Sequence, residues 1–223
     1  MAGNIEILTP NQVAFLAKVS QESSLVKKFY FTGGTPLAAF YLQHRMSEDI
    51  DLFSEEEEVN VGPIRAFIKK IEKPLGIKAV EYRQYIGLHT FELKYNTGDI
   101  LKVDFNYYPF PCIERGMKYL NIYVDSLLDI ATNKVHTIYM KPRARDFIDV
   151  FFIIREKGYN FKDLIAQAKI KFDWHIDAVE FGKRLLSAAN ATDFPRMLKP
   201  IDHAEWQDFF IEEAKKLKDG VLE

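Results

Sequence analysis

Apolar residues recur along the chain at two different spacings, and the change of spacing divides the sequence. Short apolar segments, alternating or continuous, predict strands over 29–31, 47–53, 77–83, 86–95 and 100–107. Beyond about residue 120, spacings of three and four residues predict helices over 126–139, 143–157, 161–170, 174–189 and 202–217. The pattern predicts an α+β protein with an N-terminal α/β domain over residues 1–120 and a C-terminal helical domain over residues 121–223.

Start signals predict helices between these strands. Thr9-Pro10 begins one whose apolar side carries Val13, Leu16 and Val19. Thr35-Pro36 begins another, with a capping hydroxyl followed by proline at the first helical position. We expect that helix to run for about ten residues, to Arg45, whose positive charge suits a helix C-terminus. A further helix begins at Pro63 and ends at Gly76.

Two glycines and two aspartates stand in an order that points to phosphate and metal chemistry. Gly33 and Gly34, at the end of a strand, let the backbone approach a ligand, and the next helix directs free N–H groups to the same point. Asp49 and Asp51 are two residues apart on a strand, so their carboxylates emerge on one face. At an effective dielectric of about 20, two charges about 5 Å apart repel by about 3 kcal/mol. A divalent cation relieves that repulsion, and hard oxygen ligands suit Mg²⁺ shared with substrate phosphates.

A third carboxylate lies on the predicted strand 100–107. In that strand Val103 and Phe105 face one way and Asp104 faces the other. If it lies beside Asp49 and Asp51, three carboxylates converge, with Asp104 as a third metal ligand or as a general base. A glycine pair alone also fits a plain turn, and a D-x-D pair alone fits a solvated strand edge. The order and spacing of the three signals together favour a metal site.

Composition narrows the possible partners. The chain has 30 Lys and Arg against 32 Asp and Glu, a formal net charge of −2, and 48% hydrophobic residues. There is no polybasic arm, so any contact with nucleic acid must come from a folded patch. No apolar run reaches the about 20 residues of a membrane helix, and the first residues do not resemble a secretory signal. A single cysteine, Cys112, fits a reducing compartment, and we expect a cytoplasmic protein without a membrane partner.

The glycine pair and the segment after it resemble a known family. Gly33-Gly34-Thr35 followed by His44-Arg45-Met46-Ser47-Glu48-Asp49-Ile50-Asp51-Leu52-Phe53 is similar to the AbiEii/AbiGii-type toxin nucleotidyltransferases, in the polymerase-β-like superfamily. The resemblance continues through 103–105, 131–134 and 145–150 and covers about residues 28–155. It implies a polymerase-β-like nucleotidyltransferase domain, a mixed sheet with flanking helices, followed by a helical domain.

The resemblance also implies an activity and partners. An NTP and Mg²⁺, as two ions, would be bound, and a nucleotide would be transferred to an acceptor hydroxyl, reported as tRNA for some members, with another RNA as an alternative. Many members are the toxin of a toxin–antitoxin pair or act in abortive infection, which implies an antitoxin protein as partner.

The family pattern assigns roles to individual residues. Gly33, Gly34 and Thr35 match the phosphate-binding turn, and the metal-binding and catalytic carboxylates match Asp49, Asp51 and Asp104. Two further active-site positions match Lys134 and Asp146. Lys134 would reach a phosphate as a point charge, the alternative being a solvated helix lysine. Asp146 would orient Lys134 or the nucleotide sugar.

Three residues near these motifs leave alternatives open. Arg45 would contact a phosphate or form a salt bridge to the sheet, and Ser47 would bond near the metal site or cap the turn. Both are grouped with the nucleotide-binding residues. Asp149 lies three residues after Asp146 on one helix face, and we expect it to be structural.

The first hypothesis is therefore a Mg²⁺-dependent nucleotidyltransferase, with an RNA or a small molecule as acceptor. The alternative from another class is a non-catalytic nucleotide-binding or protein-interaction module of the same fold. A third hypothesis is a phosphotransferase that moves the γ-phosphate, because the same metal clamp serves that reaction.

Overall fold

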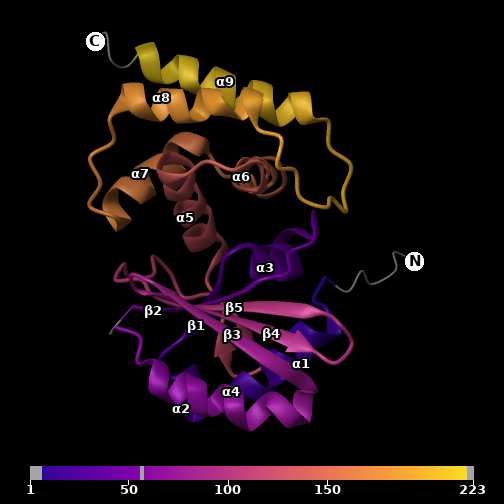
Figure 1. Ribbon diagram of the computed structural model, residues 1–223. Helices are drawn as coiled ribbons and strands as arrows, with labels where there is room; N and C mark the ends of the chain where they lie inside the picture. The colour runs from indigo at the N-terminus through magenta and orange to yellow at the C-terminus, as the bar shows by residue number, and fades with distance from the viewer. Residues whose placement is uncertain (1–6, 56–57, 220–223) are drawn as a thin grey trace. The chain divides into compact units, whose positions relative to one another are not determined.

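The chain folds into two compact units. The computed structural model describes residues 7–55 and 58–219 (Figure 1). The first unit comprises Met1–Tyr41 and Ser47–Ser126, and the second comprises Leu42–Met46 and Leu127–Glu223. The five residues Leu42–Met46 thus belong to the second unit although the chain around them belongs to the first. An isolated bridge between Arg45 and Met197 ties them to the C-terminal part of the chain.

The first unit is built on a mixed five-stranded sheet. Its strands lie in the order β1 (Tyr30–Thr32), β2 (Ile50–Ser54), β5 (Ile100–Tyr107), β4 (Leu88–Tyr95) and β3 (Ile77–Tyr85). Strands β2 and β5 run parallel, and the other neighbours are antiparallel. All five predicted strands are confirmed. The second of these strands, β2, begins later than expected. Its pairing with β1 reaches no further than Thr32 and Asp51, because the chain turns away from β1 at Gly33.

Helices α1 (Pro10–Val19), α2 (Ser23–Val26) and α4 (Val61–Leu75) lie on one face of this sheet (Figure 1). The core between them includes Phe15, Leu16, Phe67, Ile68, Phe91, Val103 and Phe105. Thr9 caps α1 as expected, in a capping box with Gln12. The expectation for Val13 was wrong: it is 42% exposed, because the buried side of α1 passes through Gln12, Phe15, Leu16 and Val19.

The helix expected at Thr35-Pro36 differs in start, form and end. It begins one residue earlier, as α3 (Gly34–Pro36), and continues as a π-helical segment over Leu37–Leu42. Thr35 is therefore not its cap. The Thr35 hydroxyl instead donates to the carbonyl of Asp49 and fixes the chain that enters β2.

Three short elements escaped prediction. They are helix α2 and the two-stranded hairpin of β6 (Lys118–Tyr119) and β7 (Ile122–Tyr123). None is long enough to show an apolar period, and each is held by tertiary contacts. Strand β1, for example, reaches the end of this hairpin through a bridge between Phe31 and Val124.

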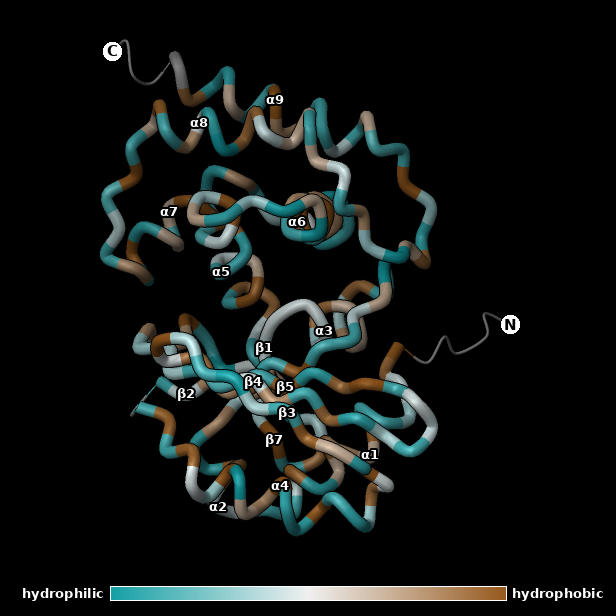
Figure 2. Tube along the Cα trace, viewed as in Figure 1, coloured by the Kyte–Doolittle hydropathy of each residue, from teal (hydrophilic) through white to brown (hydrophobic). Residues whose placement is uncertain are grey.

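The second unit is helical, as predicted. It contains α5 (Leu127–Met140), α6 (Ala144–Lys157), α7 (Phe161–Lys171), α8 (Ala178–Leu186), a 3₁₀ turn (Ser187–Asn190) and α9 (His203–Asp219). Residues 174–177 are not helical, because the Asp177 side chain caps α8 by accepting from the Glu180 amide. Rings of Phe147, Phe161, Trp206 and Phe210 pack together in its core. The teal and brown that alternate along α8 and α9 in Figure 2 show how each helix divides between a polar and an apolar side.

Candidate active site

Two of the predicted carboxylates lie side by side in the sheet of the first unit. Asp51 on β2 and Asp104 on β5 are register partners in the parallel ladder. Their strand neighbours Ile50 and Val103 are fully buried in the core under the helices. The alternation of side chains therefore places both carboxylates on the opposite face of the sheet. Asp49 stands immediately before β2, so the adjacency that the metal hypothesis required is present.

A lysine and a threonine, which were given no role from the sequence, complete this group. Lys102 Nζ lies 2.6 Å from Asp104 Oδ2 and 3.5 Å from Asp49 Oδ2. Thr90 Oγ1 donates to Asp104 Oδ1 at 2.6 Å, across the β4–β5 ladder. Strand alternation was the signal for Lys102, since it stands two residues before Asp104 on the same face. Thr90 could be found only once the register of β4 was known.

The glycine turn packs directly against the carboxylates. Gly33 has φ +85° and ψ −155°, a conformation that side chains other than glycine hardly adopt. A Cβ on Gly33 would stand 2.3 Å from Asp51 Oδ2. Thr35, fully buried, lies 2.9 Å from Ser47 Oγ and holds the Asp49 carbonyl. Thr35 and Ser47 thus form a hydrogen-bonded support at Asp49, and Gly33 packs against Asp51.

The other predicted residues meet in the second unit, in a cluster of buried charges. Lys134 Nζ on α5 lies 2.6 Å from Asp146 Oδ1 and 2.8 Å from Asp149 Oδ2, both on α6. Arg45 binds both oxygens of Asp149, at 2.6 and 2.8 Å, and Arg143 donates to Asp146 at 2.6 Å. Asp146 and Asp149 are fully buried. Lys134 is only 8% exposed, which excludes the solvated helix lysine.

Charge compensation governs the protonation of this cluster. Burial alone would raise the pKa of Asp149, but Arg45 and Lys134 hold it well below its usual range. Burial also works against the Asp146 carboxylate, and Lys134 with Arg143 lowers the pKa of that group. His44 lies 2.7 Å from Asp149 through Nε2, and burial lowers its pKa despite this contact. Both aspartates are therefore ionised near neutral pH, and His44 is neutral.

The geometry decides some of the open alternatives. Arg45 forms an ion pair, although its partner is Asp149 on α6 and not the sheet. Asp149 is the hub of that cluster, in agreement with a structural role. Cys112 is the single cysteine of the chain, so it has no partner for an internal disulfide.

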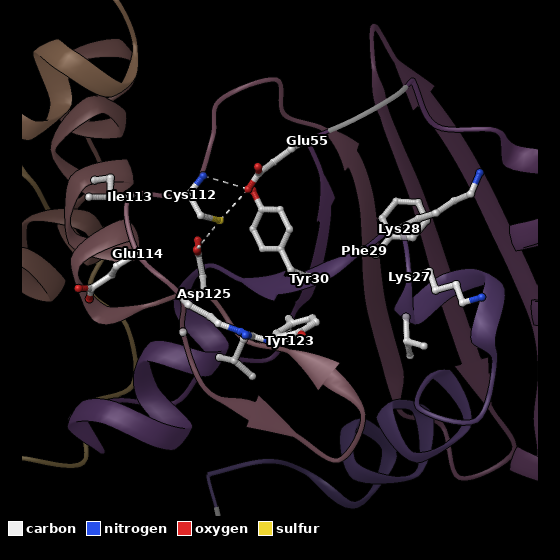
Figure 3. Close-up of a pocket in the computed structure, with 14 residues that line it drawn as sticks. Lys27, Lys28, Phe29, Tyr30, Glu55, Cys112, Ile113, Glu114, Tyr123 and Asp125 are labelled. Carbon is white, nitrogen blue, oxygen red and sulfur yellow. Dashed lines mark hydrogen bonds between the residues drawn. The ribbon is translucent and has the colours of Figure 1, made fainter.

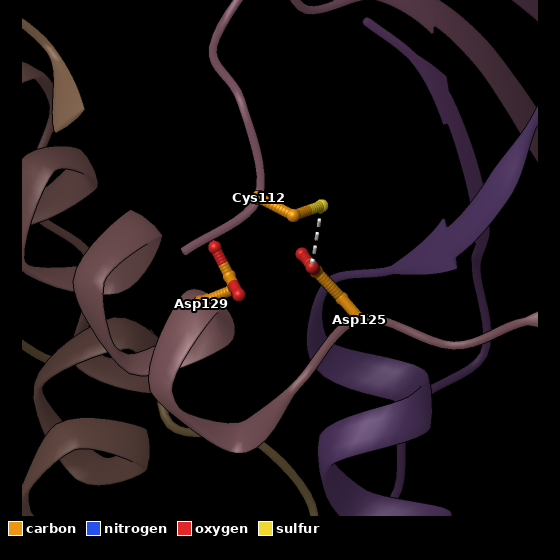
Figure 4. A group of neighbouring side chains, drawn as sticks. All are labelled: Cys112, Asp125 and Asp129. Carbon is orange, nitrogen blue, oxygen red and sulfur yellow. Dashed lines mark hydrogen bonds between the residues drawn. The ribbon is translucent and has the colours of Figure 1, made fainter. Parts of the chain in front are cut away.

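Cys112 lines a cavity of about 430 Å³ in the first unit, beside β1 and the β6–β7 hairpin (Figure 3). Its Sγ lies 2.6 Å from Glu55 Oε1 and 3.6 Å from Asp125 Oδ1, the latter contact being drawn in Figure 4. Two carboxylates beside a thiol disfavour the thiolate, which is the reactive form. This environment does not activate Cys112 as a nucleophile.

Comparison with known families decides the assignment. The model of a family described as nucleotidyl transferase AbiEii toxin, type IV toxin–antitoxin system, matches residues 14–218. The chain belongs to this family. The resemblance noted in the sequence is thereby confirmed, and the chain is a member of a nucleotidyltransferase family.

Solved structures share the fold of this AbiEii protein. A structure described as a proposed nucleotidyltransferase of H. pylori has a TM-score of 0.59 at 16% identity, covering 97% of this chain and 99% of that chain. JHP933 of Helicobacter pylori has a TM-score of 0.56 at 13% identity, covering 94% of this chain and 91% of that chain. At these identities the likeness shows the fold alone. It confirms the expected α+β architecture of a nucleotidyltransferase sheet followed by helices.

One curated protein from Aquifex aeolicus (strain VF5), described as uncharacterized, is 29% identical over 153 residues. The match covers 65% of this chain and 66% of that protein, so the chain matches just under two thirds of the relative's length. In the part of this AbiEii chain that the structure describes, no helix is long and apolar enough to cross a bilayer.

The residues present fit a hard divalent cation. Asp49, Asp51 and Asp104 supply carboxylate oxygens, the donors that such ions prefer, and the absence of a side chain at Gly33 makes room for the carboxylate of Asp51 itself. One ammonium contacts two of the three carboxylates, so negative charge exceeds positive charge within the group. A nucleotidyltransferase of this family is usually metal-dependent.

Proposed function

We propose that this AbiEii protein transfers a nucleotidyl group from an NTP to an acceptor hydroxyl, with Mg²⁺ held by Asp49, Asp51 and Asp104. The observation that carries the proposal is the register of β2 and β5, which sets Asp51 beside Asp104 on the face opposite the core. Like charges gathered on one face cost free energy unless a ligand compensates them. The glycine turn against Asp51 supports the same site, because it gives a phosphate close access to the backbone.

The reaction follows from the chemistry of the two substrates. The acceptor oxygen forms a bond to the α-phosphorus, the bond between that phosphorus and the bridging oxygen to the β-phosphate breaks, and pyrophosphate leaves. The acceptor proton passes to a base, and Asp104 is the candidate of the first unit in the alternative in which it is not a metal ligand. The two divalent ions of the proposal supply charge stabilisation at the phosphates when bound.

Gly33 and Gly34 act on this site through the backbone, whereas Thr35 and Ser47 act through their hydroxyl groups. Thr35 joins Ser47 and the Asp49 carbonyl in one network, so it fixes the direction from which Asp49 enters β2. We propose that this network holds the carboxylates in place when the phosphates bind. The same network makes the glycine turn rigid.

In the second unit we propose Lys134 and Asp146 as the residues that contact the nucleotide or position one another for that contact. Support comes from the burial of the pair and from its bracing by Arg143 and Asp149. A lysine held between two carboxylates keeps its charge and one orientation, which suits a group that recognises phosphate. Arg45 contributes by holding Asp149.

RNA, with tRNA first, is the acceptor class that we propose, with an antitoxin as the partner that restrains the activity. The test incubates the protein with each of the four α-labelled NTPs, Mg²⁺ and total tRNA. Label should enter tRNA with release of pyrophosphate, and Asp49→Ala should reduce the rate at least 1,000-fold, because it removes a metal ligand. Asp208→Ala, an exposed change on α9, is the matched control and should retain the wild-type rate.

Each other outcome has a definite meaning. Nucleoside diphosphate in place of pyrophosphate would establish phosphoryl transfer and overturn the proposal. Label on a small molecule but not on tRNA would keep nucleotidyl transfer and reject the RNA acceptor. If no acceptor is labelled and calorimetry shows NTP binding that needs neither Mg²⁺ nor Asp51, the protein is a nucleotide-binding module.

A further inference from the structure

Lys102 lies among the three aspartates of the proposed metal site, and the proposed function does not explain its presence there. It precedes Asp104 by two residues on β5, and its Nζ lies between Asp104 Oδ2, at 2.6 Å, and Asp49 Oδ2, at 3.5 Å. Because Asp51 pairs with Asp104 in the ladder, the four side chains share one face of two adjacent strands. They comprise three carboxylates and one ammonium.

The ammonium engages the oxygen that a metal ligand must offer. Asp104 already accepts from Thr90 at Oδ1 and from Lys102 at Oδ2, both at 2.6 Å. A divalent ion that takes Oδ2 meets the positive charge of Lys102 at the same oxygen, and two cations repel. Lysine ordinarily carries a positive charge at neutral pH, and the ammonium of Lys102 lies 2.6 Å from a carboxylate oxygen of Asp104.

We propose that Lys102 is a built-in counter-cation that occupies the carboxylates in the nucleotide-free protein and competes with the divalent ion. This inference rests on the proposed function, which supplies the ion. Its consequence is an order of binding. The free protein binds a divalent ion weakly, and the ion becomes tightly bound when the triphosphate adds its own negative charge and ligand oxygens.

A purely structural salt bridge predicts something different. If Lys102 served only to hold β5, its loss would lower stability and would not strengthen metal binding. The side chain of Lys102 is 38% exposed but that of Asp104 is only 8% exposed, so the pair can also add to stability, and metal affinity is the measurement that separates the two roles. The position of the ammonium among three carboxylates is better explained by competition for their charge.

The experiment measures Mn²⁺ binding to the nucleotide-free protein by electron paramagnetic resonance of the free ion. Lys102→Met should bind Mn²⁺ at least tenfold more tightly than wild type. Lys94→Met is the matched control: Lys94 lies on the neighbouring strand β4, pairs with Glu81, and has no contact with the three carboxylates among the ion pairs that the structure gives it. Its Mn²⁺ affinity should stay within twofold of wild type.

Two further variants test the mechanism of the gain. Lys102→Arg keeps the charge and should restore an affinity near that of wild type. Adding Asp104→Asn to Lys102→Met should abolish the gain, because the contested carboxylate is gone. Thermal melts establish that each variant is folded, and Lys102→Gln replaces Lys102→Met if the latter is not.

The outcomes separate this inference from the proposed function. Unchanged or weaker Mn²⁺ binding by folded Lys102→Met overturns the counter-cation. The wild-type protein is also titrated with Mn²⁺ in the presence of an NTP whose α,β-bridging oxygen is replaced by methylene. If Mn²⁺ does not bind with the analogue present, the proposed metal site itself fails. If it binds there tightly while Lys102→Met gains nothing, only the inference about Lys102 fails.

Discussion

The two units each gather aspartates and basic residues, but they compensate the charges differently. On the sheet of the first unit, Lys102 contacts two of the three carboxylates, and the side chain of Asp49 is 36% exposed. In the second unit, Asp146 and Asp149 are fully buried and receive the nearly buried Lys134 and Arg45. Arg143, whose side chain is 36% exposed, binds Asp146 at the edge of that cluster. The carboxylates of the first group are thus partly accessible, whereas those of the second are buried and matched by buried cations.

This difference distinguishes a group that can still accept a counter-ion from one whose charges are already matched within the protein. Partly exposed carboxylates gain a favourable interaction when a cation binds. A buried ion cluster repays the loss of hydration only through close hydrogen bonds, and removing one partner leaves the others without compensation. The same substitution, aspartate to alanine, should therefore cost much less stability in the first group than in the second.

The largest effect on stability is expected in the second unit. Asp149→Ala removes the shared partner of Arg45, Lys134 and His44, and it should lower the free energy of unfolding by about 3–5 kcal/mol. Urea denaturation followed by circular dichroism measures this change. The exposed Asp208→Ala should stay within about 0.5 kcal/mol of wild type. A loss for Asp149→Ala as small as that of Asp208→Ala would show that the cluster contributes no stability.

The next effect concerns the glycine turn of the first unit. Gly33→Ala places a Cβ against Asp51 Oδ2 in a conformation that alanine avoids, so it should cost about 1–3 kcal/mol and displace the carboxylate. We expect nucleotidyl transfer to fall at least 100-fold with it. Gly182→Ala, inside α8 with open space around its Cβ position, should instead add about 0.5–1 kcal/mol of stability. Both changes are measured by urea denaturation together with the labelled-NTP assay.

If Gly33→Ala retained both its stability and its activity, the close contact between the turn and Asp51 would be irrelevant to the site. A loss of stability with full activity would assign the turn to folding alone. The Gly182→Ala control guards against a general sensitivity of the chain to alanine.

Much of this picture follows from the sequence, and the part that does not depends on distant contacts. Strand 100–107 was predicted with the bounds that β5 has, because Val103 and Phe105 alternate with polar residues. The parallel pairing of β2 with β5 could only be assumed, since it joins residues about 50 positions apart. Lys102 was given no role from the sequence, because its contact with Asp49 becomes apparent only once β2 is placed beside β5.

The second unit shows the same limit more sharply. Lys134, Asp146 and Asp149 could be selected from the sequence, yet their partner Arg45 comes from a segment about 100 residues earlier. Helical spacing carries no information on such a partner. The sequence predicted a helix from residue 174, because the apolar spacing of α8 extends back to that position. The side chain of Asp177 caps the N-terminus of α8, so the helix begins only at Ala178. Periodicity thus finds elements, whereas charge compensation needs the fold.

A smaller effect should come from the carboxylates on the sheet. Asp49→Ala, which abolishes the proposed transfer, should leave the free energy of unfolding within about 1 kcal/mol of wild type, since relief of repulsion offsets the loss of the contact with Lys102. Urea denaturation beside Asp149→Ala gives the direct comparison. A loss as large as that of Asp149→Ala would erase the distinction between the two groups of aspartates.

The smallest effect is a pH dependence that originates in the buried cluster. Burial lowers the pKa of His44 below its usual value near 6.5. Just below that value, the unfolded chain therefore binds a proton at this histidine and the folded chain does not. This contribution to stability is complete above the unfolded pKa and is lost as pH falls below it. The free energy of unfolding should therefore decrease from pH 7 to pH 5, and burial lowers the pKa of His89 and His136 in the same sense.

His44→Gln removes one such group and should make that decrease shallower, by at most about 1.4 kcal/mol for each pH unit. His175→Gln, at an exposed position between α7 and α8, is the matched control and should leave the slope unchanged. The measurement is a series of urea denaturations between pH 5 and pH 7. An identical slope in wild type and His44→Gln would mean that the cluster accepts a charged histidine. The burial of His44 beside Asp149 would then not suffice to keep it neutral.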